Sequence, residues 1–235
     1  MGKNKLQKFA EMKSFDRVFQ PGFKEIFEKD YYLKGKWRDK VFGNTNPLIL
    51  ELGCGKGEYT LFLAEKYPDI NFIGVDIKGA RIWKGAKSAN ENRISNVAFL
   101  RTRIELINAF FYDDEVEEIW ITFPDPQLKK RRNKKRLTGP RFLNSYSKFL
   151  KHEGLIHLKT DNDVLFKYTL DVINYNKLSL VRSTENLYAS DFIDDVLSVK
   201  TFYEKQFLAE GSSINYLEFK LPRNIQIKAP PEDEE

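Results

Sequence analysis

The sequence has few of the residues that form disulfides and metal sites. It contains 235 residues with one cysteine, Cys54, so no intramolecular disulfide and no thiolate metal cluster can form. Two histidines are too few for a typical zinc site, so we expect no metal. No run reaches the roughly 18 apolar residues of a membrane-spanning helix, and the N-terminus lacks the apolar stretch of a secretory signal. These absences predict a soluble, cytoplasmic protein without a membrane partner.

Positive charge is what the sequence has in excess. The net charge is +5 and the sequence pI is about 9.0, although the last four residues, 232–235, are all acidic. A basic body indicates a polyanionic partner such as a nucleic acid. A hydrophobic fraction of 41% and an aromatic fraction of 14% can supply the core of one globular domain.

Short apolar runs alternate with segments of helical length from residue 48 onward. Such runs are typical of buried parallel strands, and the alternation predicts βαβ units. The predicted strands are 48–52, 71–76, 96–100, 118–123 and 154–159, and the runs 178–182 and 215–222 are candidates for closing antiparallel strands. The predicted helices are 58–67, 79–92, 102–111, 139–152 and 164–176.

This pattern predicts an α/β fold with a doubly wound, mostly parallel, Rossmann-like sheet of seven strands and helices on both faces. We expect residues 1–45 to form a basic, mobile N-terminal arm with short helices. Residues 46–224 should form the main domain. Residues 225–235 should form a disordered acidic tail, because their composition cannot supply a core.

The stretch LILELGCGKGEYT, residues 48–60, predicts a strand, a glycine-rich turn and the start of a helix. Gly53 and Gly55 remove side chains where the chain must turn tightly and where a ligand can approach the backbone. The spacing matches neither the Walker loop nor the dinucleotide fingerprint. Glu51 precedes the glycines, and its carboxylate would repel a pyrophosphate and attract a cation. S-adenosylmethionine (SAM), with its ammonium and sulfonium groups and no phosphate, fits such a loop.

Asp76 ends the next predicted strand, in the stretch FIGVDIK. A carboxylate at this place can accept both ribose hydroxyls of an adenosine, and the carboxyl ends of strands are where ligands bind in open α/β sheets. The third strand ends in Arg101, Thr102 and Arg103, so this part of the predicted cofactor pocket is weakly specified. We interpret Cys54, inside the loop, as a small residue and not as a nucleophile.

The fourth predicted strand leads into Pro124-Asp125-Pro126, followed by the basic stretch 129–136. Two prolines restrict the backbone around Asp125, which places a carboxylate rigidly. Seven of the eight residues in the stretch KKRRNKKR are basic, and such a run can dominate affinity for nucleic acid. The competing interpretations are a proline turn that only ends a strand and a solvated charged patch.

Two further clusters fall near the predicted site. Asp161 follows the fifth strand in HLKTDND, at the same edge of the sheet. The stretch Thr201-Phe202-Tyr203-Glu204 is polar and aromatic. Taken alone, each of these clusters fits a helix cap or a surface pair as well as a binding site.

Together these motifs resemble the bacterial tRNA (guanine-N7)-methyltransferases that act on position 46 of the variable loop. The resemblance extends from about Leu48 to Pro222 and is carried by LELGCGKGEYT, GVDIK, FPDPQLKKRRNKKRLTGPRFL, LKTDN and TFYEKQF. The Pro-Asp-Pro motif with its basic run is the specific part. The glycine loop alone would indicate only a methyltransferase.

The resemblance implies a class I SAM-dependent methyltransferase that modifies tRNA as a monomer or a homodimer. Asp125 is then the catalytic residue. Cofactor binding is implied for Glu51, Gly53, Gly55, Asp76, Arg103 and Asp125. Substrate binding is implied for Lys129, Asp161, Thr201, Phe202, Tyr203 and Glu204. The other basic residues of the run are expected to contact RNA phosphates: Lys130, Arg131, Arg132, Lys134, Lys135 and Arg136.

Two positions depart from the family pattern. Family members usually have Trp after Pro-Asp-Pro, where this chain has Gln127. They usually have Asp or Asn at the position that aligns with Arg103.

Other functions stay open at this stage. Another SAM-dependent RNA or DNA methyltransferase would share the glycine loop. A non-catalytic RNA-binding protein would follow if the cofactor pocket were degenerate. An NAD-dependent oxidoreductase is disfavoured by the glycine spacing and by Glu51.

Overall fold

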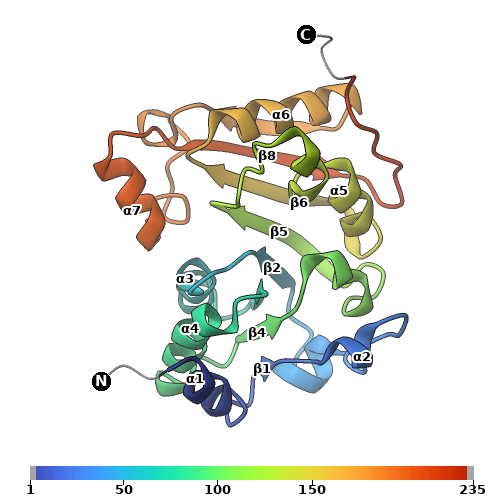
Figure 1. Ribbon diagram of the computed structural model, residues 1–235, viewed down its shortest axis with the longest axis vertical. Coiled ribbons are helices and arrows are strands. Elements are labelled where there is room, and N and C mark those ends of the chain that lie inside the picture. Colours follow the sequence, from blue (N-terminus) through green and yellow to red (C-terminus); the bar gives the residue numbers. More distant parts are fainter. Residues whose placement is uncertain (1–3, 232–235) are drawn as a thin grey trace. The chain divides into compact units, whose positions relative to one another are not determined.

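The computed structural model describes residues 4–231 (Figure 1). The chain divides into two compact units, the first ending at Ile119 and the second beginning at Trp120. The described residues contain eight strands, which follow the order β1-β4-β3-β2 in the first unit and β6-β8-β7 in the second. The boundary between the units falls inside strand β5, Val116–Thr122.

The first unit contains the glycine-rich turn and the N-terminal segment. Its elements in chain order are α1 (Lys5–Met12), β1 (Val18–Phe19), α2 (Phe23–Ile26), the π-helix η1 (Trp37–Phe42), β2 (Leu48–Leu52), α3 (Glu58–Lys66), β3 (Asn71–Asp76), α4 (Gly79–Glu91), β4 (Val97–Arg101) and the 3₁₀ helix η2 (Ile104–Ala109). Strand β3 pairs in parallel with β2 and with β4, and β4 pairs in parallel with β1. The predicted parallel βαβ arrangement is confirmed.

Apolar strands explain the core of the first unit. Every residue of β2 and of β3 is buried, because continuous apolar runs suit strands that are covered on both faces. The two-residue strand β1 is the eighth strand, where the sequence predicted seven. It lies in the segment predicted to be a mobile arm, and the described part of this segment, residues 4–45, packs within the unit. For example, Met12 of α1 has no exposed surface, and the indole Nε1 of Trp83 donates to Glu11 Oε2 at 2.6 Å.

The second unit contains the proline turn and the basic run. Its elements are the 3₁₀ helix η3 (Lys130–Lys135), α5 (Pro140–Tyr146), β6 (Leu150–Thr160), α6 (Asp163–Tyr175), β7 (Leu180–Thr184), the 3₁₀ helix η4 (Leu187–Ala189), α7 (Phe202–Ala209) and β8 (Asn215–Leu221). Strand β8 pairs antiparallel with β6 and with β7. The closing antiparallel strands predicted from the sequence are therefore confirmed, and the fold is α/β with a mostly parallel sheet.

Two predicted helices differ from the observed elements. Residues 104–109 form a 3₁₀ helix, where 102–111 was predicted to be a helix of full length. Helix α5 ends at Tyr146, and strand β6 begins at Leu150, inside the predicted helix 139–152. Phe149 and Leu150 are buried at this junction, so tertiary packing overrides the helical pattern. The predicted tail 225–235 lies in part outside the described residues.

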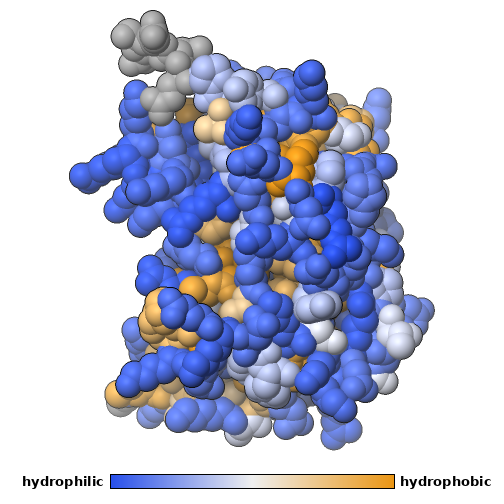
Figure 2. All heavy atoms as spheres, turned by 90° about the vertical axis from the view of Figure 1, so that its right-hand side faces the viewer, coloured by the Kyte–Doolittle hydropathy of each residue, from blue (hydrophilic) through white to orange (hydrophobic). Residues whose placement is uncertain are grey.

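Polar side chains dominate the face of the molecule shown in Figure 2. No helix in residues 4–231 is both long enough and apolar enough to span a bilayer. The same residues contain no group of three or more side chains suited to hold a metal ion.

Candidate active site

The glycine-rich turn joins β2 to α3 with three residues in the left-handed region. The φ angles of Gly53, Gly55 and Gly57 are 81°, 56° and 71°. Residues with a Cβ rarely adopt such angles, so the spacing of the glycines fixes the path of the turn. The backbone N–H groups of Gly53 and Cys54 both donate to the carbonyl of Val75, at 2.8 and 3.1 Å. The turn is thereby tied to the neighbouring strand β3.

Helix α4 packs directly against this turn. A Cβ added at Gly85 would lie 2.5 Å from the carbonyl oxygen of Lys56, and one added at Gly57 would lie 2.5 Å from the ring of Phe99. A larger residue at Gly85 would therefore have to displace the backbone of Lys56, and one at Gly57 would have to displace the ring of Phe99. The turn is a rigid, main-chain surface, which is what a ligand that approaches the backbone requires.

Asp76 lies at the end of β3 and holds the turn from the other side. Its Oδ2 accepts a hydrogen bond from the N–H of Gly55 at 2.9 Å, and its Oδ1 accepts one from the N–H of Lys78 at 2.7 Å. The residue is 9% exposed. A carboxylate has about four lone-pair sites, so each oxygen keeps capacity for one further donor, such as a ribose hydroxyl. The predicted proximity of Asp76 and the glycine turn is confirmed.

Glu51 is buried at 4% exposure, one residue before the end of β2. Its Oε2 accepts hydrogen bonds from the backbone N–H of Thr60, at 2.9 Å, and from the hydroxyl of Thr60. Thr60 lies in the first turn of α3 and has 1% exposure. The contact holds the carboxylate of Glu51 in place beneath the turn. The sequence analysis did not identify Thr60 as a partner of Glu51. Its position three residues after Gly57, in the first turn of the predicted helix, is the signal that could have identified it.

The chemistry around the turn fits SAM. Two buried carboxylates, Glu51 and Asp76, lie at the ends of adjacent strands, and the glycines between them expose main chain. Two carboxylates that accept hydrogen bonds favour a cationic ligand with ribose hydroxyls over a pyrophosphate. The hydroxyl of Thr102 adds a buried polar atom without a hydrogen-bond partner in residues 4–231, directly after β4. Burial and the charges of Glu51 and Asp76 raise the pKa of the Cys54 thiol well above its usual value, which disfavours a nucleophilic role.

Arg103 lies directly before η2 in the first unit and is exposed. It provides no side-chain hydrogen bond to cap that helix. Its neighbour Arg101 lies with its guanidinium 4.6 Å from the ring of Phe9, on α1. The cofactor contact predicted for Arg103 stays a prediction.

The Pro-Asp-Pro turn in the second unit holds Asp125 exposed to solvent. Asp125 Oδ1 accepts a hydrogen bond from the backbone N–H of Gln127 at 3.0 Å, which closes a tight turn on the aspartate. Phe123 and Gln127 have φ angles of 48° and 50°. Residues with a side chain adopt this region at a cost, and strained residues cluster at active sites. The hydrogen bond from Gln127 therefore holds one carboxylate oxygen of Asp125 within a strained turn.

The basic run forms η3 and its flanks, and five of its six predicted phosphate contacts are exposed. Arg136 differs from them, with 5% exposure. Its Nε donates to the carbonyl of Pro126 at 3.1 Å, and its guanidinium lies 4.3 Å from the ring of Tyr168. Burial lowers the pKa of Arg136, and it supports the Pro-Asp-Pro turn from inside. This placement differs from the exposed position expected of a phosphate contact.

Asp161 follows β6 and is half-buried. Burial and then the nearby charges of Asp163 and Glu210 raise the pKa of its carboxyl, while a hydrogen bond from its own backbone opposes the shift. An ionised carboxylate at this place costs folding free energy. Residues tolerated at such a cost are candidates for function.

The stretch Thr201–Glu204 begins helix α7 through a capping box. The Thr201 side chain accepts from the N–H of Glu204, and the Glu204 carboxylate accepts from the N–H of Thr201, both at 3.3 Å. Phe202 and Tyr203 are 51% and 36% exposed, whereas Glu204 is fully buried. The four residues therefore separate into an exposed aromatic pair and a buried cap. Sequence reasoning had grouped all four as substrate contacts.

Glu204 belongs to a buried network that also includes Lys159 and Tyr188. The Tyr188 hydroxyl donates to Glu204 Oε1 at 2.6 Å, and burial, with this contact, raises the pKa of Tyr188. Lys159 Nζ donates to the carbonyls of Leu197 and Val199, at 2.9 and 3.0 Å. Nothing in the sequence marks Tyr188, since its partners are distant along the chain.

The predicted site residues are divided between the two units. The first unit unites the cofactor residues Glu51, Gly53, Gly55 and Asp76 around one turn. The second unit contains Asp125, Lys129, Asp161 and the start of α7.

Comparisons with known proteins agree with this interpretation. The fold is that of class I methyltransferases. A crystal structure of the 16S rRNA methyltransferase KamB matches with a TM-score of 0.59 at 14% identity, over 78% of this chain and 92% of that chain.

A family model, Methyltransf_4, described as "Putative methyltransferase", matches residues 45–217, and the chain belongs to this family. The tRNA (guanine-N(7)-)-methyltransferase of Bacteroides thetaiotaomicron is 50% identical over 98% of this chain and 90% of its own length. The corresponding protein of Christiangramia forsetii is 49% identical over 93% of this chain and 98% of its own length.

Proposed function

We propose that this protein transfers the methyl group of SAM to N7 of a guanine in tRNA, and that the target is position 46 of the variable loop. The observation that carries the proposal is the Pro-Asp-Pro turn. It presents an exposed carboxylate, Asp125, and a run of exposed basic residues begins after the next three residues, at Lys129. The buried carboxylates and open backbone of the glycine turn support SAM as the methyl donor. The names of relatives at 49–50% identity support tRNA and guanine N7.

The chemistry requires alignment more than acid–base catalysis. SAM supplies an electrophilic methyl group on a sulfonium. Guanine N7 has a free lone pair and no proton, so the N7–methyl bond forms while the methyl–sulfur bond breaks, and the sulfur keeps the electron pair. No general base is needed. The task of the protein is to hold N7, the methyl carbon and the sulfur in line.

Asp125 is suited to the charge that this reaction creates. The guanine ring becomes cationic as the bond forms, and a fixed carboxylate stabilises that cation or holds the N1–H and N2–H donors of the base. One oxygen of Asp125 is occupied by the N–H of Gln127, which fixes the orientation of the other. Arg136 holds the following carbonyl, of Pro126. The carboxylate therefore needs little reorganisation during the reaction.

The remaining residues of the second unit are assigned to RNA binding. The exposed basic residues of the run neutralise phosphates, and this affinity offsets the few kcal/mol needed to unstack a base from the folded tRNA. They are Lys129, Lys130, Arg131, Arg132, Lys134 and Lys135. Phe202 and Tyr203 present rings that can stack on nucleobases. Glu204 supports this binding surface indirectly, because its buried carboxylate caps the first turn of α7.

The experiment that tests the proposal is to locate the methyl group. The protein is incubated with an unmodified tRNA transcript and SAM labelled in the methyl group, and the product is digested and mapped. The proposal predicts 7-methylguanosine at position 46 and none in a transcript that has adenine there. A label on another base atom would instead favour another SAM-dependent RNA methyltransferase. Absence of transfer, with tRNA still bound, would favour a non-catalytic RNA-binding protein.

A further inference from the structure

The N-terminal segment of the first unit surrounds a cavity of about 580 Å³, separate from the glycine turn. Pockets for small ligands in proteins commonly measure roughly 300–1,000 Å³. The cavity is lined by Asp16, Arg17, Phe19, Tyr32, Leu33, Lys36, Lys40 and Val41. None of the residues assigned above to cofactor or RNA binding is among them.

The lining combines positive charge with an exposed aromatic ring. Arg17, Lys36 and Lys40 are basic, and Asp16 is the single acid. Lys40 also contacts the exposed Asp39 at 3.0 Å, a pair that solvent screens. The ring of Tyr32 is 67% exposed and rests against Tyr31, with ring centroids 4.6 Å apart. Cations beside an exposed ring form the combination that binds single-stranded nucleic acid.

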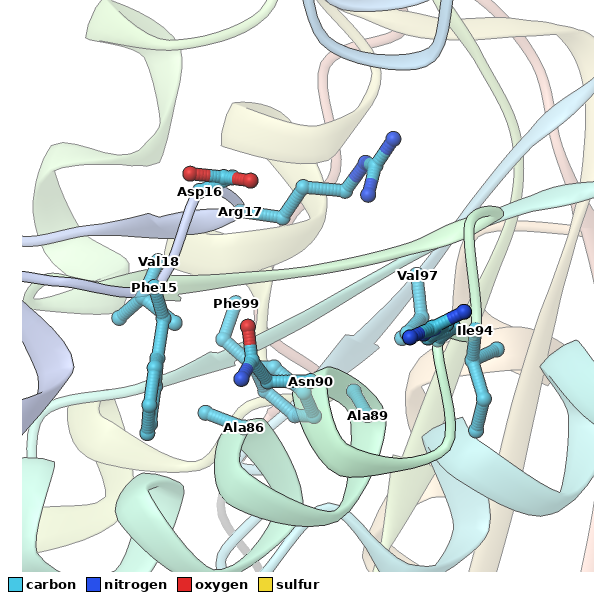
Figure 3. A pocket seen from close by; sticks show the side chains of 11 residues that line it. Phe15, Asp16, Arg17, Val18, Ala86, Ala89, Asn90, Ile94, Val97 and Phe99 are labelled. Atoms are coloured by element: carbon cyan, nitrogen blue, oxygen red, sulfur yellow. The ribbon is translucent and has the colours of Figure 1, made fainter.

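The orientation of Arg17 is set by the strand that it precedes. A smaller cavity of about 170 Å³ lies between β1 and α4 (Figure 3). Asp16 and Arg17 line both this cavity and the larger one. Figure 3 shows the side chain of Arg17 extending away from Ala86 and Ala89 of α4. Its Nε donates to the carbonyl of Val41, a residue of the larger cavity, at 3.4 Å. The charge of Arg17 is therefore presented on the side of the larger cavity.

The wall of the larger cavity is held rigidly. Trp37 lies between the lining residues Leu33 and Lys40 in the sequence and is buried. Its indole Nε1 donates a hydrogen bond to the carbonyl of Phe110 at 2.7 Å. The Glu115 carboxylate accepts from the backbone of Gly35 and of Trp37, at 2.9 and 3.3 Å. Arg38 pairs with Glu117 at 2.7 Å. Because these contacts already order the wall, a ligand would lose little free energy in organising the site.

We propose that this cavity binds one nucleotide of the RNA substrate. The base stacks on Tyr32, and a phosphate lies against Lys36, Lys40 and Arg17. The site is a second RNA contact, distinct from the basic run of the second unit. The proposal rests on tRNA as the substrate and adds a place on the enzyme that grips it.

The test uses the full-length protein and an unmodified tRNA transcript. We expect Tyr32→Ala to weaken tRNA binding about fivefold or more, because stacking is worth about 1–3 kcal/mol per base, whereas Tyr32→Phe keeps the affinity. The double variant Lys36→Gln/Lys40→Gln should flatten the plot of log affinity against log salt, by about 0.7–0.9 for each phosphate that is no longer neutralised. Transcripts with photoreactive 4-thiouridine should crosslink to the peptide that contains Tyr32.

Matched controls come from the same unit. Lys24 and Lys29 are exposed and do not line the cavity, so the Lys24→Gln/Lys29→Gln variant should bind tRNA as the unaltered protein does. Tyr112→Ala is the aromatic control, since Tyr112 is 61% exposed outside the cavity. Thermal unfolding of each variant verifies that the fold is intact.

The outcomes separate this inference from the proposed function. If the protein methylates tRNA but Tyr32→Ala and the double lysine variant bind tRNA with unchanged affinity and salt slope, the inference is overturned. Equal losses of affinity in the cavity variants and in the matched controls would also overturn it. If the cavity variants lose affinity selectively while the methyl appears on another nucleotide, the RNA contact stands and the assignment to position 46 fails.

Discussion

Lys159 Nζ lies 2.8 Å from Glu204 Oε1, and neither side chain has any exposed surface. The two residues join the end of β6 to the first turn of α7, so the pair fixes the helix that presents Phe202 and Tyr203. Burial lowers the pKa of Lys159, and the charge of Glu204 opposes that shift. A charge buried in this way is tolerated only with its partner present.

The pair should therefore show strong coupling. Lys159→Met or Glu204→Met alone leaves one uncompensated buried charge, and each is expected to cost about 3–5 kcal/mol of unfolding free energy. The double variant removes both charges, so its loss of stability should be smaller than the sum of the two single losses, by up to about 3 kcal/mol. Chemical denaturation of the four proteins measures this coupling. Purely additive losses would show that the pair does not hold α7.

Asp161 should make stability depend on pH. Its pKa is raised above the usual 3.8, so the folded state holds the proton more tightly than the unfolded state does. Stability from this group is highest below pH 3.8 and falls as the pH rises through the folded-state pKa. We therefore expect Asp161→Asn to unfold at a higher temperature than the unaltered protein at a pH of about 7.5.

The pH dependence provides the control for this prediction. The gain in stability from Asp161→Asn should shrink as the pH falls through the raised folded-state pKa of Asp161, because the native carboxyl then becomes neutral. Asp171→Asn offers a matched comparison, because Asp171 lies on the exposed side of α6. A gain of the same size at every pH would mean that the carboxylate charge is not the cause.

The basic run should govern the salt dependence of tRNA binding. Neutralising Lys130, Arg131 and Arg132 with glutamine should flatten the slope of log affinity against log salt, by about 0.7–0.9 for each phosphate that the variant leaves unneutralised. SAM affinity should stay unchanged. Filter binding of tRNA across a range of salt concentrations measures the slope.

A comparison set within the second unit keeps this test specific. Lys148, Lys151 and Lys167 are exposed but lie outside the basic run, and their triple glutamine variant has the same change in net charge. An equal flattening in both triple variants would indicate only a general effect of net charge. A slope that does not change would assign the run to a solvated surface.

Local patterns predicted the strands well because burial in a parallel sheet leaves a plain apolar signature. Residues 48–52 and 71–76 were predicted with the bounds that β2 and β3 have. The same reasoning placed Asp76 beside the glycine turn, since both follow adjacent strands. Helix α7 was not predicted, although Thr201 and Glu204 have the spacing of a capping box.

Other features depend on contacts that are distant along the sequence. Glu204 is buried and paired with Lys159 because two segments separated by 45 residues in the sequence pack together. No local sequence pattern reveals such a contact. The burial of Arg136 is similar, because a basic run gives no sign of which member turns inward against Pro126. Composition alone described the N-terminal segment as an arm. In the structure, Trp37 anchors this segment by donating a hydrogen bond to the carbonyl of Phe110.

Asp125 should affect the chemical step more than binding. Asp125→Asn keeps the size of the side chain and removes its charge, so the single-turnover rate of methyl transfer should fall about 10²- to 10³-fold, as it does when one electrostatic stabiliser is removed. The dissociation constants of tRNA and SAM should change far less. A rate within about threefold of the unaltered protein would leave Asp125 as part of a structural turn closed on Gln127.

Methyl transfer to N7 is tested most directly by changing that one atom of the substrate. Two tRNAs are prepared that differ only at position 46, one with guanosine and one with 7-deazaguanosine, in which a C–H group replaces N7. Single-turnover transfer from SAM labelled in the methyl group is then measured with both, at equal occupancy of the enzyme. We predict rapid transfer to the guanosine tRNA and none to the 7-deazaguanosine tRNA, although both bind. Equal transfer to the two tRNAs would contradict N7 of this guanine as the acceptor.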